Sequence, residues 1–279
     1  MTDSTFNEEV IQFGNDNNLI GIITEPTTRN PLKPVVLILN SGALHRTGAC
    51  RNSVHLARAI ANDGFTSFRF DYYGIGDSGF GGAIEENALT PKQEIFDAMD
   101  ELEKRLGSLT FVVHGLCSGA RDAFSAALND TRIVAISQID SYSYQNKGYF
   151  LRRLLSFLSR PSSWLNAIKV RIPNTSKNNT IEEPNSAYET QVWPEYPPRK
   201  EVENAYQKLV DRKIKMLVVY TGSWNDTYNY EKQFFDVFSM VQFGELVTLK
   251  YMPKANHIMS NEQHRHEFIA QFKQFVQTI

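Results

Sequence analysis

The chain has 279 residues, of which 42% are hydrophobic and 22% are charged, and this is an ordinary globular composition. Its length is enough for one large domain that buries a sizeable core and carries an insertion. The formal net charge is -2, so the chain lacks the strong basic excess that is typical of proteins that bind nucleic acid. Its overall charge therefore gives no reason to expect nucleic-acid binding.

The ends of the chain and its cysteines bear on location. The first ten residues are acidic and polar, without the charged and then apolar layout of a secretory signal, and no window is as long and apolar as a membrane span. We therefore expect a cytoplasmic protein. The two cysteines, Cys50 and Cys117, are expected to be free thiols, because a reducing compartment does not maintain disulfides.

Strand-like apolar runs alternate with helical periodicity, which predicts helices packed on a mostly parallel sheet. The runs 9–13 and 19–24 flank the turn formers of 14–18 and predict an opening hairpin. Strands at 34–40 and 65–71 follow, with a helix at 52–63 between them.

The next predicted helix has a well-marked start. Thr90 is its expected cap, Pro91 suits the first position, and Gln93 completes a capping box. The remaining predicted elements are a strand at 109–114, a helix at 123–128, strands at 132–140, 215–222 and 245–252, and a C-terminal helix from about Asn261.

Residues 141–205 interrupt this alternation and are predicted to form a helical lid inserted into a core made of 1–140 and 206–279. Basic side chains occur between 141 and 181 without any acidic one. They are Lys147, Arg152, Arg153, Arg160, Lys169, Arg171 and Lys177. Either they form a solvated helix face, or they form an anion site.

The stretch 112–121, VVHGLCSGAR, places Cys117 between Gly115 and Gly119 at the end of a predicted strand. The nucleophile elbow of many hydrolases is G-x-S-x-G, in which a sharp turn from strand to helix holds the nucleophile clear of the sheet. Cys117 occupies the position of that serine.

The chain resembles the α/β-hydrolase superfamily over most of its length. The resemblance rests on GLCSG at 115–119, on DYYGIGDS at 71–78, and on a late acid and histidine in the order nucleophile, acid, histidine. With SGALHRTGACR at 41–51, the pattern is also similar to hydrolases associated with bacterial exosortase systems. The resemblance implies an α/β-hydrolase fold with a mostly parallel central sheet, flanking helices and a helical lid.

The same resemblance implies a catalytic triad of Cys117, Asp226 and His257. His257 lies between the last strand and the last helix and is the expected general base, while Asp226 follows the strand at 215–222 and is expected to orient the imidazole. Asp140 is the alternative acid. The oxyanion hole is expected to use the backbone N–H of Ser118 and a second N–H from Gly42 or Ala43.

Other polar residues receive structural interpretations. Asn40 and Ser41 stand where many members of the superfamily have His-Gly, so this loop departs from the usual pattern. His114 is expected at the edge of the core, and Asp71 in a loop beside the site. His264 and His266 are two apart on a predicted helix and therefore do not share a face, so we expect surface residues and no metal site. No cofactor is expected.

A cysteine nucleophile favours certain substrates. A thiolate is a better leaving group than an alkoxide, so the intermediate from an oxygen ester tends to revert, whereas a thioester or an activated lactone is better matched. We therefore expect a thioesterase or acyltransferase that forms an acyl-enzyme on Cys117. A carboxylic ester or lactone hydrolase is the alternative enzyme, and a binding protein that has lost turnover is the alternative outside enzymes.

The expected partner is a small acyl substrate such as a coenzyme A or carrier-protein thioester, with Arg152 and Arg153 as binding residues. Contact with an anionic membrane surface through the same segment is the competing interpretation.

Overall fold

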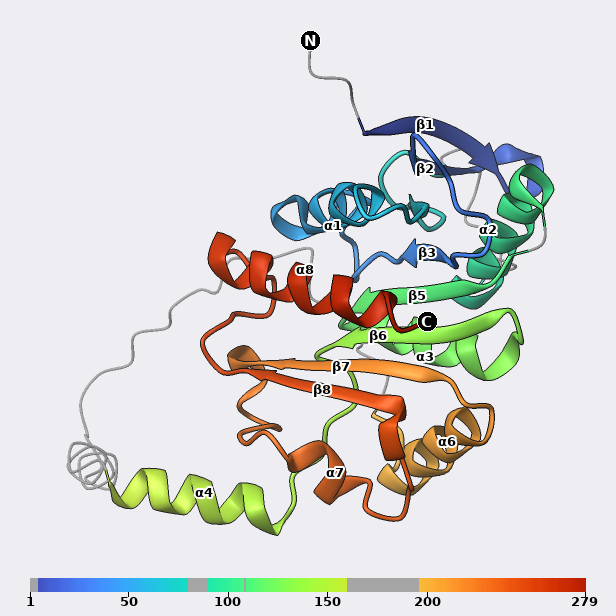
Figure 1. Ribbon diagram of the computed structural model, residues 1–279. Helices are drawn as coiled ribbons and strands as arrows, with labels where there is room; N and C mark the ends of the chain where they lie inside the picture. The colour runs from blue at the N-terminus through green and yellow to red at the C-terminus, as the bar shows by residue number, and fades with distance from the viewer. Residues whose placement is uncertain (1–4, 80–89, 108, 160–195) are drawn as a thin grey trace, which may run out of the picture.

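The computed structural model describes residues 5–79, 90–107, 109–159 and 196–279. These residues form an eight-stranded sheet in the order β1-β2-β4-β3-β5-β6-β7-β8 (Figure 1). The strands are β1 Phe6–Phe13, β2 Leu19–Pro26, β3 Val35–Ile38, β4 Ser67–Phe70, β5 Phe111–Leu116, β6 Ile133–Ile139, β7 Lys215–Thr221 and β8 Val247–Met252. The pairs β1 with β2 and β2 with β4 are antiparallel, and all the other pairs are parallel.

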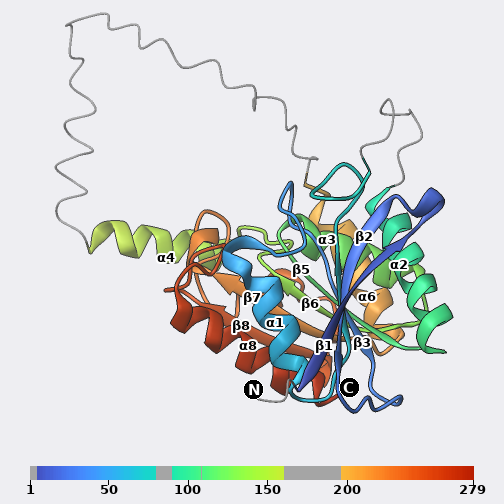
Figure 2. The ribbon, with the colours of Figure 1, turned by 90° about the horizontal axis from the view of Figure 1, so that it is seen from above.

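Helices cover both faces of this sheet (Figure 2). The helices are α1 Asn52–Ala61, α2 Pro91–Leu106, α3 Ser118–Asn129, α4 Lys147–Leu158, α6 Arg199–Asp211, α7 Gln233–Val237 and α8 Glu262–Val276. Apolar side chains of α1 and α8 form one core cluster with one face of the sheet, and those of α2, α3, α6 and α7 form a larger cluster with the other face. Because both faces are covered, the central strands are buried throughout, as β3 is at every position.

The local signals in the sequence are confirmed where they were strongest. β1 and β2 form the opening hairpin, with Phe13 opposite Leu19. The Thr90 hydroxyl accepts the N–H of Gln93 at 3.4 Å, and Pro91 begins α2. The predicted fold class, a mostly parallel sheet between layers of helices, is therefore correct.

The connection from β6 to β7 contains the segment that was predicted as a lid. Helix α4 extends outward from the sheet in Figures 1 and 2, and Tyr149 is its buried residue. Helix α6, by contrast, buries Val202, Tyr206 and Leu209 in the larger core cluster. The predicted boundary at residue 205 thus falls inside a core helix. Residues 160–195 of the predicted lid lie outside the described residues.

Candidate functional site

The elbow at Cys117 joins β5 directly to α3. Cys117 has φ 57° and ψ -114°, a backbone conformation that is costly for any residue other than glycine. Its N–H donates to the Ile139 carbonyl of β6 at 2.9 Å. The strained turn lifts the side chain out of the sheet at the N-terminus of α3, as the sequence pattern predicted.

The two glycines of the elbow are needed because the backbone packs tightly there. A Cβ on Gly115 would lie 2.1 Å from the backbone of Gly119, and a Cβ on Gly119 would lie 2.2 Å from the carbonyl oxygen of Asn40. These approaches let α3 pack against its own strand and bring the loop after β3 next to the elbow at Cys117. The spacing of G-x-C-x-G is therefore a steric requirement of this turn.

His257 connects Cys117 to a buried carboxylate. Its Nδ1 lies 2.7 Å from Oδ2 of Asp140, and Cys117 is the second residue whose interaction raises the pKa of the ring. With Nδ1–H donating to Asp140, Nε2 is the ring nitrogen that faces the thiol. The three side chains come from the ends of β5, β6 and β8, which meet at the carboxyl edge of the sheet.

The structure corrects the predicted orienting acid. Asp226 is exposed, and among the described residues only its backbone carbonyl has partners, the side chains of Gln145 and Tyr149. The carboxylate beside His257 belongs to Asp140, the alternative considered from sequence. Asp140 follows β6 directly, whereas Asp226 lies several residues beyond the end of β7.

The end of β7 and the segment after it contact both Asp140 and His257. The backbone N–H and the hydroxyl of Thr221 donate to the two Asp140 oxygens at 2.7 and 2.6 Å. Ser223 accepts the backbone N–H of His257 at 3.0 Å. The indole of Trp224 is stacked on the imidazole, with ring centroids 5.2 Å apart and planes 13° apart. Sequence reasoning missed these three residues.

The charge environment favours a protonated imidazole. The hydrogen bond to Asp140 is the largest cause, followed by the interaction with Cys117, and together they raise the pKa of His257 to about 9. Burial opposes this shift, but the Asp140 side chain is fully buried and has no competing ion-pair partner among the described residues. An imidazole in this setting accepts a proton readily and holds it.

One of the two candidate N–H groups of the oxyanion loop is already bonded. Gly42 donates to the hydroxyl of Ser118 at 2.7 Å. In the described part of the chain the N–H of Ala43 has no acceptor, and the N–H of Ser118 is in the first turn of α3, where intrahelical acceptors are absent. The open pair of donors is therefore Ser118 and Ala43.

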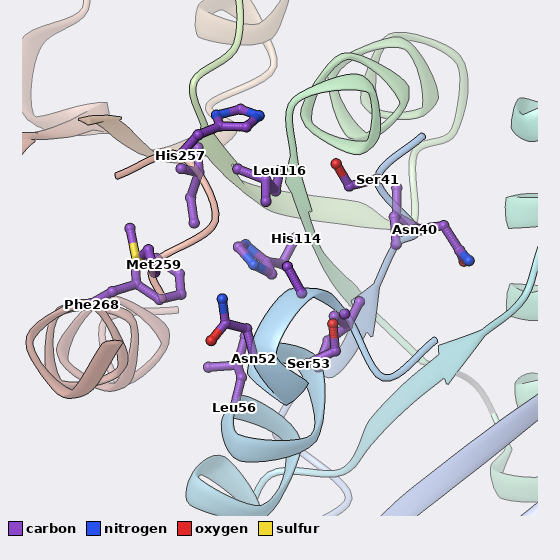
Figure 3. Close-up of a pocket in the computed structure, with 15 residues that line it drawn as sticks. Asn40, Ser41, Asn52, Ser53, Leu56, His114, Leu116, His257, Met259 and Phe268 are labelled. Atoms are coloured by element: carbon purple, nitrogen blue, oxygen red, sulfur yellow. The ribbon is translucent and has the colours of Figure 1, made fainter. Parts of the chain in front are cut away.

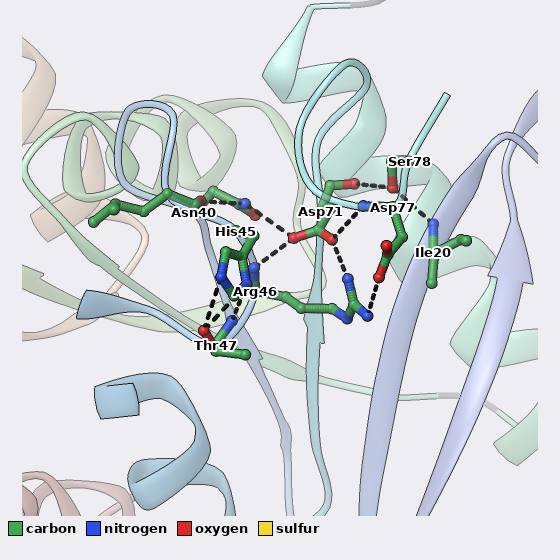
Figure 4. Close-up of polar contacts among 9 residues, drawn as sticks. Ile20, Asn40, His45, Arg46, Thr47, Asp71, Asp77 and Ser78 are labelled. Carbon is green, nitrogen blue, oxygen red and sulfur yellow. Dashed lines mark hydrogen bonds and ion pairs between the residues drawn. The ribbon is translucent and has the colours of Figure 1, made fainter. Parts of the chain in front are cut away.

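Asp71 holds the neighbouring loops together (Figure 4). Its buried carboxylate accepts the Arg46 backbone N–H, pairs with the Arg46 guanidinium and accepts the Asp77 N–H at 3.2 Å. Asn40 Nδ2 lies 3.4 Å from the same carboxylate. The loop after β3 and the loop after β4 are thus fixed to each other, which is the structural role expected for Asp71.

His114, His264 and His266 are not part of the His257–Asp140 pair. His114 is buried, its Nδ1 lies 3.0 Å from the Ser137 hydroxyl, and burial lowers its pKa to about 4, so the ring is neutral. His266 is exposed, and His264 is half-buried. The described residues contain no cluster of His, Cys, Asp or Glu that fits a metal ion.

His257 lines a small cavity, and two open grooves lie beyond Trp224 and Asp226. The cavity, of about 40 Å³, has His257, Leu116 and Ser41 on one side and Asn52 and Ser53 on the other (Figure 3). A groove of about 480 Å³ is lined by Tyr144, Tyr196, Trp224, Thr227 and Asp226 among others.

The second groove adjoins the first at Asp226. It measures about 430 Å³ and is lined by Arg152 and Arg153 of α4 together with Tyr149, Asn225 and Asn229. The arginines predicted to bind substrate therefore lie in a groove that begins where the aromatic groove next to His257 ends. Within the part of the chain that the structure covers, no helix is long and apolar enough to cross a membrane.

The chain is similar to known proteins in its structure, but comparison with family models and curated proteins finds no match. An esterase from Pyrococcus furiosus is 14% identical with a TM-score of 0.59, and the alignment covers 99% of this chain and 92% of the esterase.

Two further solved structures agree with this likeness. An α/β serine hydrolase homologue from Coxiella burnetii is 14% identical, with a TM-score of 0.51 and coverage of 99% and 96%. A candidate α/β hydrolase of unknown function from Agrobacterium tumefaciens is 14% identical, with a TM-score of 0.55 and coverage of 97% and 95%. The chain therefore has the α/β-hydrolase fold.

Proposed function

We propose that the protein is a cysteine-dependent enzyme that forms an acyl-enzyme on Cys117 from a thioester or another activated acyl donor. The observation that carries this proposal is the grouping of Cys117 on its strained elbow, His257, and the Asp140 carboxylate 2.7 Å from the His257 Nδ1, at the carboxyl edge of the sheet. It contains a nucleophile, a proton acceptor and a group that orients the acceptor, which are the parts required for acyl transfer. A protein that only binds ligands has no need of this alignment.

The first half of the proposed reaction acylates the cysteine. His257 Nε2 takes the Sγ proton, and the thiolate attacks the carbonyl carbon of the donor. The carbonyl oxygen becomes an oxyanion, to which the N–H groups of Ser118 and Ala43 donate. When the carbonyl re-forms, the bond to the donor's sulfur breaks, and the imidazolium returns its proton to the leaving thiolate.

The second half releases the acyl group by the same residues. His257 removes a proton from water or from an acceptor amine or thiol, and the resulting nucleophile attacks the acyl-enzyme. The thiolate of Cys117 leaves and regains the proton from His257. Water gives a carboxylic acid, whereas an acceptor gives a new amide or thioester, so the catalytic residues serve hydrolysis and transfer equally.

The cysteine argues for thioesters over oxygen esters. In an intermediate with one sulfur and one alkoxide leaving group, the sulfur leaves more easily and the reaction reverts. With a thioester donor both leaving groups are thiolates, and the acyl-enzyme accumulates. An activated lactone meets the same condition, and lactone or ester hydrolysis remains the second candidate enzyme activity.

The grooves beside the site fit a donor with an acidic end. The aromatic groove begins at Trp224, next to His257, and meets the second groove at Asp226. There Arg153 donates to the Tyr149 hydroxyl at 3.1 Å, and the Arg152 guanidinium lies 4.7 Å from the centre of the Tyr230 ring. Neither arginine has a carboxylate partner among the described residues, so both are free to bind phosphate groups of a coenzyme A or carrier-protein donor.

Intact mass spectrometry tests the acyl-enzyme. The wild-type protein is incubated with short- and long-chain acyl thioesters and with the matching oxygen esters, with Cys117→Ala as the blank. We expect an added acyl mass that maps to Cys117 and that forms faster from the thioester of each pair. If no donor acylates Cys117, and the donors still bind, the protein is a ligand-binding member of the fold.

Charge reversal tests the basic groove. Arg152→Glu with Arg153→Glu is expected to raise the KM for coenzyme A thioesters at least tenfold and to leave the KM for small uncharged thioesters unchanged. Arg199→Glu with Lys200→Glu, on the exposed start of α6, is the matched control. Loss of sedimentation with anionic liposomes at unchanged KM would assign α4 to a membrane surface instead.

A further inference from the structure

In this structure the last residue of β7 and the segment after it support both His257 and the Asp140 carboxylate. Thr221 donates two hydrogen bonds to Asp140, Ser223 accepts the backbone N–H of His257, and Trp224 covers one face of the ring. Asp140 has φ 50°, so its placement requires support from its neighbours. The two hydrogen bonds from Thr221 supply that support.

Tight packing fixes this segment against the loop that carries His257. Gly222 donates its N–H to the Ala255 carbonyl at 2.9 Å. A Cβ on Gly222 would lie 2.1 Å from the carbonyl oxygen of Pro253, so only glycine allows the two loops to approach this closely. Trp224 follows two residues later at the end of a short 3-10 helix, Gly222–Trp224, so its backbone is held close to the loop that carries His257.

We propose that Trp224 is a positioning residue for His257, which fixes the ring plane by stacking and stabilises the imidazolium that the reaction forms. A cation lying over the face of an indole is attracted by the negative face of the ring system, and tryptophan provides the strongest such attraction among aromatic side chains. The parallel planes, 13° apart, leave Nδ1 directed at Asp140 and Nε2 directed at Cys117. Trp224 also lines the aromatic groove, so a bound acyl donor contacts the same indole.

The titratable groups near His257 are few. Asp140, from the end of β6, and Cys117, from the elbow, act on it directly. His114, from β5, lines the same small cavity and is neutral because burial lowers its pKa to about 4. The substitution at Trp224 leaves Asp140 and Cys117 in place, so a change in the His257 titration reports the loss of the indole.

The test is a titration of the His257 ring by NMR in protein labelled at histidine carbons, without any substrate. The signal is assigned with His257→Gln, and the variants are Trp224→Phe and Trp224→Leu. Phe235→Leu is the control, because it removes a partly exposed aromatic ring that has no contact with His257. Thermal unfolding of each variant is recorded to verify that it is folded.

We expect the midpoint of the His257 titration to fall by about half a pH unit or more in Trp224→Leu, and by less in Trp224→Phe, which retains a ring. The control is expected to leave the midpoint unchanged. An unchanged midpoint in Trp224→Leu, or equal shifts in the leucine and phenylalanine variants, overturns the proposal. The proposal for Trp224 rests on the proposed function only in taking His257 as the base. Because the titration needs no acyl donor, a failure to acylate Cys117 and a failure to observe the shift are separate results.

Discussion

Replacing Asp140 by asparagine separates the observed site from the one predicted by sequence. The carboxylate accepts hydrogen bonds from His257 and Thr221, and it is the largest cause of a His257 pKa of about 9 in place of 6.5. That difference corresponds to roughly 3 kcal/mol in favour of the protonated ring. We expect Asp140→Asn to remove most of it, and to lower the equilibrium ratio of the imidazolium–thiolate pair to the neutral pair by about 50- to 100-fold.

A tautomer effect adds to this loss. The amide nitrogen of an asparagine can donate to Nδ1 of His257, which forces the proton onto Nε2 and directs an N–H at Cys117. The ring then cannot take the thiol proton, and loss of the orienting carboxylate in serine triads costs about four orders of magnitude in turnover for this reason. Because a thiol ionises more easily than a hydroxyl, we expect a smaller loss here, of about 10³-fold in acyl transfer.

Alkylation of Cys117 by iodoacetamide measures the first effect without a substrate. The rate is followed by intact mass from pH 5 to 10 in a Cys50→Ser background, so that one thiol is scored. Asp226→Asn is the matched control, because its carboxylate lies in the grooves and has no contact with His257. A slow Asp226→Asn variant beside a normal Asp140→Asn variant would refute the assignment of Asp140.

The remaining predictions concern reactivity and stability. Iodoacetamide is expected to label Cys117 before Cys50, although Cys50 is the more exposed thiol. The reason is that Cys117 has His257 as a proton acceptor and lies at the start of α3. Peptide mapping after brief treatment measures the labelling, and preferential labelling of Cys50 would contradict the expectation. Glu94 is buried, and burial raises its pKa to about 7, so its contribution to stability is present below pH 4.5 and is lost as the pH rises towards 7. Glu94→Gln, which can still accept the Tyr73 N–H, is therefore expected to raise the free energy of unfolding at pH 8 by about 1 to 3 kcal/mol but not at pH 4.5, as measured by urea denaturation; equal changes at both pH values would contradict the charge argument.

Local chemistry explains why much of the fold was predictable. The cap at Thr90, the hairpin of β1 and β2 and the elbow at Cys117 each depend on residues within a few positions of one another. A Cβ at either glycine of the elbow would lie 2.1 or 2.2 Å from a neighbouring backbone atom, so side chains larger than hydrogen are excluded there. Few sequences satisfy that turn, and the pattern is therefore informative by itself. The layered arrangement of helices on a sheet was predictable for the same reason, because the periodicities of strands and helices are both local patterns in the sequence.

The boundary of the insertion was harder to predict because helical periodicity does not say what a helix packs against. α4 and α6 both lie between β6 and β7, and both have amphipathic sequences. Val202 and Tyr206 of α6 reach the core, whereas Tyr149 is the buried residue of α4. Only the three-dimensional arrangement distinguishes a covering helix of the sheet from one that extends away from it.

The acid could not be chosen from sequence because two strands that adjoin at the active edge both end near an aspartate. β6 pairs with β7 in parallel, so Asp140 and the segment 221–226 emerge side by side, and both lie between Cys117 and His257 in sequence. Distance along the chain decides between them: Asp140 follows Ile139 directly and stays at the edge, whereas the 3-10 helix Gly222–Trp224 carries Asp226 onwards into the grooves. Because Asp140 follows β6 and pairs with His257 there, the end of β7 supports this pair instead of providing a carboxylate. Thr221, Ser223 and Trp224, which make these supporting contacts, are the residues in the sequence that mark this arrangement.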